Sequence, residues 1–316
     1  MSRKAAAGGV VWLGLAAASR LQTAPLNTIE LLFLLGPLVV APLGLELYIQ
    51  SNREKEIGFP IRIAQQIQLP AALGAAASFW LPRGVLPMLL ALPWFAVGCL
   101  FGIEGLIAVS QRKFRKLKSV CGIGSFLYLP IGCAWLMASS LGLTPMGFQE
   151  PIVLLTAVHF HFAGFAAPLL AMAAASAVEK RSADIQKVFK VVAIGVLIGP
   201  GLLAAGFVIG PGVKLAAALV VVCSEAALSL IFLALVGAIR PRLAQVLIAI
   251  SAISVLFSMV LAGVWAIGEF PLQPFVHLDE MARLHGTANA FGFILCGLLG
   301  WTITVRQTVR LNGDLQ

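Results

Sequence analysis

Two histidines separated by one residue lie inside a long apolar run, in the stretch AVHFHFAGF at residues 157–165. Imidazole nitrogens bind haem iron and other metals, and they also exchange protons near neutral pH. On a helix, His159 and His161 are separated by about 200°, so they cannot both point at one small centre. Either the two side chains serve different sites, or one is functional and the other structural.

Three further polar side chains lie in later apolar runs: His285, Asn289 and Glu225. His285 and Asn289 are four residues apart and share a helix face, and Gly286 beside them would let another helix or a flat ligand approach the backbone. A polar or ionisable group within a membrane span costs about 2–3 kcal/mol on insertion, so each such residue is a candidate for function. A single buried histidine is also commonly satisfied by a neighbouring carbonyl or hydroxyl, and that structural alternative stays open.

The elements that must position these residues are membrane-spanning helices. Of the 316 residues, 60% are hydrophobic and only 11% are charged, and the mean hydropathy is +0.98. A soluble domain carries roughly a quarter charged residues. We therefore predict an all-α polytopic bundle of nine or ten transmembrane helices in a single membrane domain, 1–316, with no soluble domain. The expected segments are 6–20 (uncertain), 30–50, 63–81, 85–110, 119–141, 151–177, 188–210, 214–239, 243–268 and 278–305.

Basic residues predict the orientation of the chain. If all ten segments cross the membrane with the N-terminus in the cytoplasm, the inner connections and tails hold 18 of the 22 Lys and Arg. Such a bias places both termini in the cytoplasm. The first segment also resembles a signal peptide, so it spans, lies in the interface or is cleaved. Counted from the outer ends, all five polar residues above fall in the outer half of the bundle.

Charge and cysteine patterns exclude other classes of protein. The net charge of +9 comes largely from residues that flank apolar runs, including five in QRKFRKLK, so it indicates topology and no nucleic-acid partner. The five cysteines are dispersed without CxxC spacing, which is typical of free thiols packed between helices.

Two short strings resemble the haem-ligand helices of the haem–copper oxidases. HFHF is similar to their His-x-His helix and LHGTANAF to their His-Gly-Thr helix. The resemblance implies that His161 and His285 are the axial ligands of one haem b, while His159 faces elsewhere and could bind a metal. The order of the two helices is reversed and the copper ligands are missing, so the resemblance implies one haem site and no oxygen reductase.

Over most of the chain, HFHFAGF and HGTANAFGF, joined by about 120 residues of apolar helices, resemble the YndJ-like family of bacterial integral membrane proteins. This resemblance implies a location in the bacterial inner (cytoplasmic) membrane. It singles out His159, His161, Gly164, His285, Gly286 and Asn289, and it implies no particular reaction.

Three functions are compatible with these patterns. The favoured one is a transporter-like or small-molecule-binding protein whose pocket handles an unidentified small molecule, proton or ion, since intramembrane ionisable residues mark such paths. The alternatives are a haem- or metal-binding redox protein and an intramembrane enzyme acting on a lipid or isoprenoid substrate. In the enzyme alternative His285 or His159 is the general base and Glu225 the acid, so whether the protein is an enzyme stays open.

Overall fold

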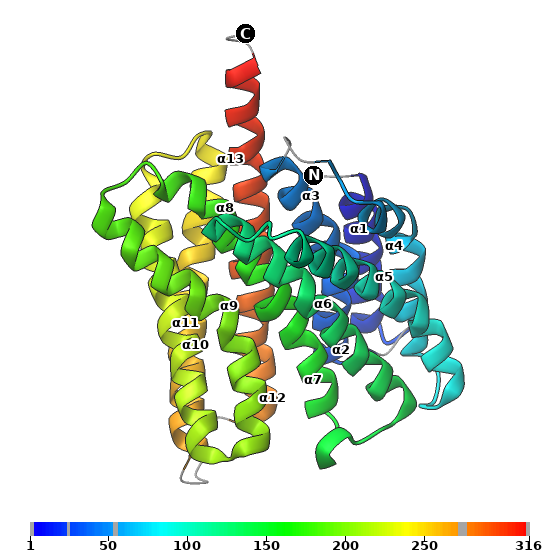
Figure 1. Ribbon diagram of the computed structural model, residues 1–316. Coiled ribbons are helices and arrows are strands. Elements are labelled where there is room, and N and C mark those ends of the chain that lie inside the picture. The colour runs from blue at the N-terminus through cyan, green and yellow to red at the C-terminus, as the bar shows by residue number, and fades with distance from the viewer. Residues whose placement is uncertain (1–2, 24–25, 53–55, 271–276, 314–316) are drawn as a thin grey trace. The chain divides into compact units, whose positions relative to one another are not determined.

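The computed structural model describes residues 3–23, 26–52, 56–270 and 277–313, and these residues form helices joined by short connections (Figure 1). Within these four ranges there is no strand. Apolar helices satisfy every backbone hydrogen bond within the segment itself, as the hydrocarbon core of a bilayer demands. The predicted all-α polytopic class is confirmed.

The chain divides into two compact units, although the sequence predicts one membrane domain. Unit 1 comprises Met1–Arg115 and Ile123–Ala166, and unit 2 comprises Lys116–Gly122 and Ala167–Gln316. One boundary falls inside a single apolar span, between Ala166 and Ala167. The two histidine motifs therefore belong to different units, His159 and His161 to unit 1 and His285 to unit 2.

Unit 1 contains the N-terminal helices. In chain order they are α1 (Arg3–Arg20), α2 (Thr28–Leu35), the π-helix η1 (Gly36–Val40), α3 (Ala41–Ser51), α4 (Phe59–Ser78), α5 (Val85–Ser110), α6 (Leu117–Leu141, in unit 1 from Ile123), the short 3₁₀ turn η2 (Pro145–Gly147), α7 (Ile152–His159) and the π-helix η3 (Phe160–Ala166). A capping box between Asn27 and Glu30 starts α2. The helices α4 and α5 form a tightly packed pair, and α1 packs against η1.

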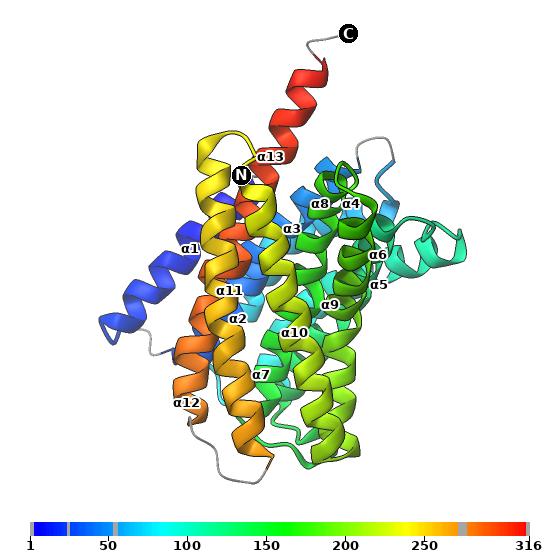
Figure 2. The same cartoon turned by 90° about the vertical axis from the view of Figure 1, so that its left-hand side faces the viewer.

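Unit 2 contains the C-terminal helices. They are α8 (Ala167–Val178), α9 (Ala183–Ile209), α10 (Pro211–Val236), α11 (Arg242–Glu269), α12 (Leu278–Met281), the π-helices η4 (Ala282–Gly286) and η5 (Ala288–Leu295), and α13 (Cys296–Gly313). The short turns that follow α9 and α10 bring each helix against the next, and α11 also packs against η5 and α13. Figure 2 shows α10 and α11 side by side.

Eight helical stretches in the described residues are long and apolar enough to cross a membrane. They are Thr28–Ser51, Val85–Ser110, Leu117–Leu141, Ile152–Val178, Ala183–Ile209, Pro211–Val236, Arg242–Glu269 and Leu278–Thr308. All ten expected segments fall on helices, and the two outside this set of eight are α1 and α4.

Three spans are locally wound as π-helix, and two of these stretches carry the histidine motifs. Pro37 lies inside η1, and Pro168 lies just beyond η3. Proline has no amide hydrogen, so it removes one i→i−4 bond and lets the preceding turn widen. Since π-turns are uncommon and recur at functional sites, these segments are where the site is best sought.

Candidate functional site

In unit 1, His161 is engaged through both ring nitrogens. Its Nδ1 donates to the Ala157 carbonyl oxygen at 2.8 Å, and its Nε2 accepts from Trp94 Nε1 at 3.0 Å. An indole nitrogen can only donate, so the Trp94 contact requires a neutral imidazole with its proton on Nδ1. The side chain is 1% exposed, and His161 is therefore a satisfied, buried histidine.

The ring of His161 is enclosed by a close-fitting socket. The ring of Phe33 meets it edge-on, with centroids 5.1 Å apart, and the Trp94 ring is stacked at 6.1 Å. Glycines occupy the positions where a side chain would collide. A Cβ on Gly132 would lie 2.7 Å from Nδ1, and one on Gly36 would lie 3.3 Å from Cδ2. These contacts fix both the rotamer and the tautomer of His161.

The neighbouring motif residues of unit 1 play different parts. His159 ends α7 with an exposed side chain, and its Nδ1 lies 2.8 Å from the Leu155 carbonyl oxygen. It points away from the enclosed His161, as the spacing of the two residues requires. Gly164 allows η3 to approach α6, since a Cβ there would lie 2.9 Å from Tyr128 Cβ.

In unit 2, His285 is half-buried and also has partners at both ring nitrogens. Its Nδ1 donates to the Ser258 carbonyl oxygen at 2.9 Å, and Asn289 Nδ2 donates to Nε2 at 3.0 Å. The Ser258 hydroxyl in turn donates to the His285 carbonyl oxygen at 3.4 Å. Asn289 Oδ1 is buried and has no hydrogen-bond partner among the described residues. A buried acceptor without a donor costs about 1–3 kcal/mol, which a bound ligand with an N–H or O–H group would recover.

The carboxyl group of Glu225 lies on the inward face of α10. The residue is 4% exposed, and within the described residues no hydrogen bond or ion pair to its side chain is present. One turn further on, Ser229 Oγ donates to the Ala252 carbonyl oxygen of α11 at 2.8 Å. Because α10 and α11 are antiparallel, Glu225 lies opposite residue 256 or thereabouts, about 3 Å along the helix axis from Ser258.

Hydrogen bonds join Ser258, His285 and Asn289, and the helix rise puts Glu225 of the same unit at a similar level along α11. We call these four residues the polar layer. Sequence reasoning singled out three of them and missed Ser258. A signal was present, because Ser251, Ser254 and Ser258 repeat at helical spacing along α11. Ser251 Oγ donates to the Phe293 carbonyl oxygen at 2.7 Å, and Ser254 fills the space left by Gly292.

Gly286 belongs to η4, the same π-wound segment as His285, and is half-buried. Sequence reasoning also missed Trp94, the indole that holds His161. No local pattern marks this tryptophan, because its partner is 67 residues away in the chain.

The haem alternative requires free imidazole nitrogens on two helices. The structure assigns His161 and His285 to separate units, so their pairing stays a prediction. The hydrogen bonding of His161 does not fit the ligand role, because the Nε2 lone pair already accepts from Trp94. In the described part of the chain, no three His, Cys, Asp or Glu side chains gather as a metal site, and a metal role for His159 also stays a prediction.

Taken together, the apolar helices and their few intramembrane polar groups define a multi-pass helical membrane protein. The model of the YndJ-like protein family matches residues 31–293, and the chain belongs to that family. This match covers both histidine motifs and all four residues of the polar layer.

One relative is a membrane protein of Bacillus subtilis (strain 168) whose name is "Uncharacterized membrane protein YndJ". It is 25% identical over 214 residues, which are 67% of this chain and 38% of the relative. The matched region thus spans well under half the length of that relative. No solved structure gives a significant match.

Proposed function

We propose that this YndJ-like protein is a transporter-like membrane protein that binds a small polar molecule at the polar layer of unit 2 and exchanges a proton at Glu225. The observation that carries the proposal is the buried Glu225 carboxyl group, which no described residue pairs or hydrogen-bonds. Burying an unpaired carboxylate in an apolar bundle costs free energy. A functional role explains why such a residue is present, and a carboxyl group that takes up and releases a proton as substrate binds and leaves has such a role.

The other polar groups of the polar layer suit substrate binding. Asn289 Oδ1 is an unused buried acceptor, and half-buried His285 lies beside it at a π-wound turn. Imidazole can donate or accept a proton near neutral pH, so His285 can pass a proton to or from the layer. Of the two motif histidines, we assign His285 to the substrate-binding site, and we assign His161 a structural role in stabilising unit 1.

The proposed orientation follows from the distribution of basic residues. With ten crossings, both termini lie in the cytoplasm and the polar layer lies in the outer half of the bacterial inner membrane. Basic residues crowd the connection between α5 and α6, which would then face the cytoplasm. Labelling of Ser182→Cys, between α8 and α9, tests this orientation. A cysteine-specific, membrane-impermeant reagent shows from which side of the membrane this position can be reached.

Infrared difference spectroscopy between two pH values tests the proton step on the purified full chain in lipid nanodiscs. We expect a carboxylic-acid C=O band that changes with pH, is absent in Glu225→Gln and is shifted in His285→Ala. The matched control is Glu179→Gln, an exposed carboxylate of the same unit, which should leave the band unchanged. If Glu225→Gln removes no band, Glu225 does not exchange a proton and the proposal fails.

Two further measurements on the same protein separate the proposed function from its alternatives. In proteoliposomes containing a pH-sensitive dye, we expect one or more solutes from a panel of small polar compounds to move protons through the wild type but not through Glu225→Gln. An absorption spectrum tests the haem alternative. A Soret band that is lost in both His161→Ala and His285→Ala would replace the proposed function with a haem-based one.

A further inference from the structure

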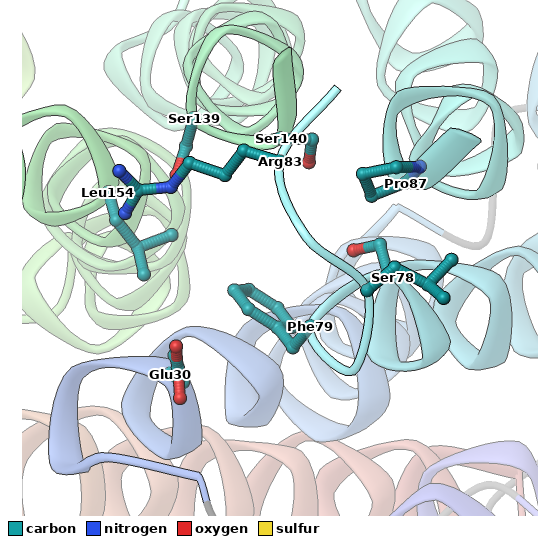
Figure 3. Close-up of a pocket in the computed structure, with 9 residues that line it drawn as sticks. Glu30, Ser78, Phe79, Arg83, Pro87, Ser139, Ser140 and Leu154 are labelled. Carbon is teal, nitrogen blue, oxygen red and sulfur yellow. The ribbon is translucent and has the colours of Figure 1, made fainter. Parts of the chain in front are cut away.

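Unit 1 contains a cavity of about 130 Å³ that is separate from the polar layer (Figure 3). The ends of α2, α4, α6 and α7 and the connection between α4 and α5 surround it. Its lining residues are Glu30, Ser78, Phe79, Leu81, Arg83, Pro87, Ser139, Ser140 and Leu154. The predicted orientation places this end of unit 1 on the outer side of the membrane. We call this space the Arg83 cavity.

Arg83 supplies the positive charge of the cavity. Its Nη2 lies 3.6 Å from Glu150 Oε1, which is longer than an N–H···O hydrogen bond. Glu150 is held in place by Ser139 Oγ, which donates to Oε1 at 2.5 Å, and by the Leu154 amide, which donates to Oε2 at 3.2 Å. Arg83 therefore pairs with the charge of Glu150, but no described residue accepts a hydrogen bond from it, and its side chain is 57% exposed. Its guanidinium N–H groups remain available to an anionic group.

Glu30 supplies a negative charge on another side of the same space. Its Oε2 accepts from the Asn27 amide at 2.8 Å as part of the capping box, while Oε1 has no partner among the described residues. Figure 3 shows the Glu30 carboxylate across the hollow from Arg83 and Leu154. Both side chains line the same space, so a ligand inside it lies near both charges.

The rest of the wall is partly apolar and partly hydroxylic. Phe79 and Pro87 line it beside the buried hydroxyl-bearing residues Ser78 and Ser140. Ser78 Oγ donates to the Ala75 carbonyl oxygen at 2.7 Å, which leaves its lone pairs free to accept. A ligand here therefore meets one cationic end, one anionic end and a small apolar side wall.

We propose that the Arg83 cavity binds a small zwitterion, a compound with an ammonium group and a carboxylate about as far apart as in an α-amino acid. Its carboxylate pairs with Arg83 and its ammonium group with Glu30. The volume sets the size, since a cavity of about 150 Å³ holds benzene, and the space in unit 1 therefore accepts about five to seven non-hydrogen atoms.

Charge complementarity excludes the simpler ligands. A carboxylate without an ammonium group would place a negative charge near Glu30 and Glu150, and an amine without a carboxylate would place a positive charge near Arg83. Like charges at such separations cost free energy and select against these partners. The cavity is independent of the proton step at Glu225, so each proposal can fail without the other.

Equilibrium dialysis of the purified full chain in nanodiscs with radiolabelled glycine and L-alanine tests the proposal. Unlabelled methylamine and acetate serve as competitors that carry only one of the two charges. We expect saturable binding of at least one zwitterion. Methylamine and acetate should compete at least about tenfold more weakly than the zwitterions, because each lacks one charge-assisted hydrogen bond.

Two charge-removing variants and one filling variant sharpen the test. Arg83→Gln and Glu30→Gln should each weaken binding by about tenfold or more, and glutamine at position 30 preserves the capping box of α2. Ser140→Leu should fill the space without changing its charge and should also abolish binding. The control Asp184→Asn, at an exposed surface ion pair in unit 2, should bind as the wild type does.

Three results would overturn the zwitterion site. The first is the absence of saturable binding of either amino acid to a wild-type sample that is folded by circular dichroism. The second is competition by methylamine or acetate as strong as that by the zwitterions. The third is undiminished binding in Arg83→Gln, Glu30→Gln and Ser140→Leu, which would place the ligand elsewhere on the protein.

Discussion

His161 in unit 1 and His285 in unit 2 occupy similar sequences and similar π-wound segments, yet their surroundings differ. His161 is 1% exposed, and Trp94 and Ala157 engage both of its ring nitrogens. His285 is half-buried beside Asn289, whose Oδ1 has no partner in the described residues. Fully satisfied polar groups stabilise a bundle, whereas an unpaired buried acceptor such as Asn289 Oδ1 can bind a ligand. On this difference rests our proposal that the His161 motif is structural and the His285 motif functional.

The strongest way to test this comparison is to remove the His161 ring. His161→Ala leaves Trp94 Nε1 without its acceptor and opens a cavity between Phe33 and Trp94, so we expect the free energy of unfolding to fall by about 3 kcal/mol. Unfolding by denaturing detergent in mixed micelles measures the change. A loss below about 1 kcal/mol would show that the socket contributes little to stability.

A second, smaller effect is expected when the socket is narrowed. Gly132→Ala places a Cβ 2.7 Å from His161 Nδ1, and overpacking of this kind costs about 2 kcal/mol. The matched control is Gly9→Ala in α1, where a Cβ meets nothing within 4 Å. The same detergent titration should separate the two variants. Equal stability of both alanine variants would contradict a tight enclosure around His161.

The smallest effect on stability is expected in unit 2. His285→Ala removes hydrogen bonds of a half-buried ring to Ser258 and Asn289, and we expect a loss of about 1 kcal/mol or less. The same variant should nevertheless shift the infrared band of Glu225, whereas His161→Ala should leave that band in place. The reverse pattern, with His161 controlling the band and His285 controlling stability, would exchange the roles of the two motifs.

Much of the fold could be predicted from the sequence because its signals are local. Apolar runs fix the helices, since in a bilayer a segment must satisfy its own backbone. Glu150 before Pro151 predicts a helix start, and the Leu154 amide does donate to the Glu150 carboxylate. The π-winding of η3, η4 and η5 was not predicted, because it depends on how each helix packs against its neighbours.

The candidate site was predicted in part. Polar side chains are rare within apolar segments because they cost free energy on insertion into the membrane. The sequence alone therefore singles out His161, Glu225, His285 and Asn289. Arg83 is not marked in this way, because it lies in the connection between α4 and α5, outside the apolar segments. Arg83 and Glu30 line one cavity although they are more than 50 residues apart in the chain. No local sequence pattern predicts that these helix ends lie together.

The sequence by itself determined that this is an all-α membrane protein of the YndJ-like family and which polar residues the bilayer must tolerate. Only the tertiary structure decided which of those residues are satisfied. The partner of His161 is an indole from α5, and the partner of His285 is a serine carbonyl from α11, 27 residues earlier in the chain. Hydrophobicity is a property of each residue alone, whereas hydrogen-bond satisfaction belongs to pairs that meet only after the helices have packed.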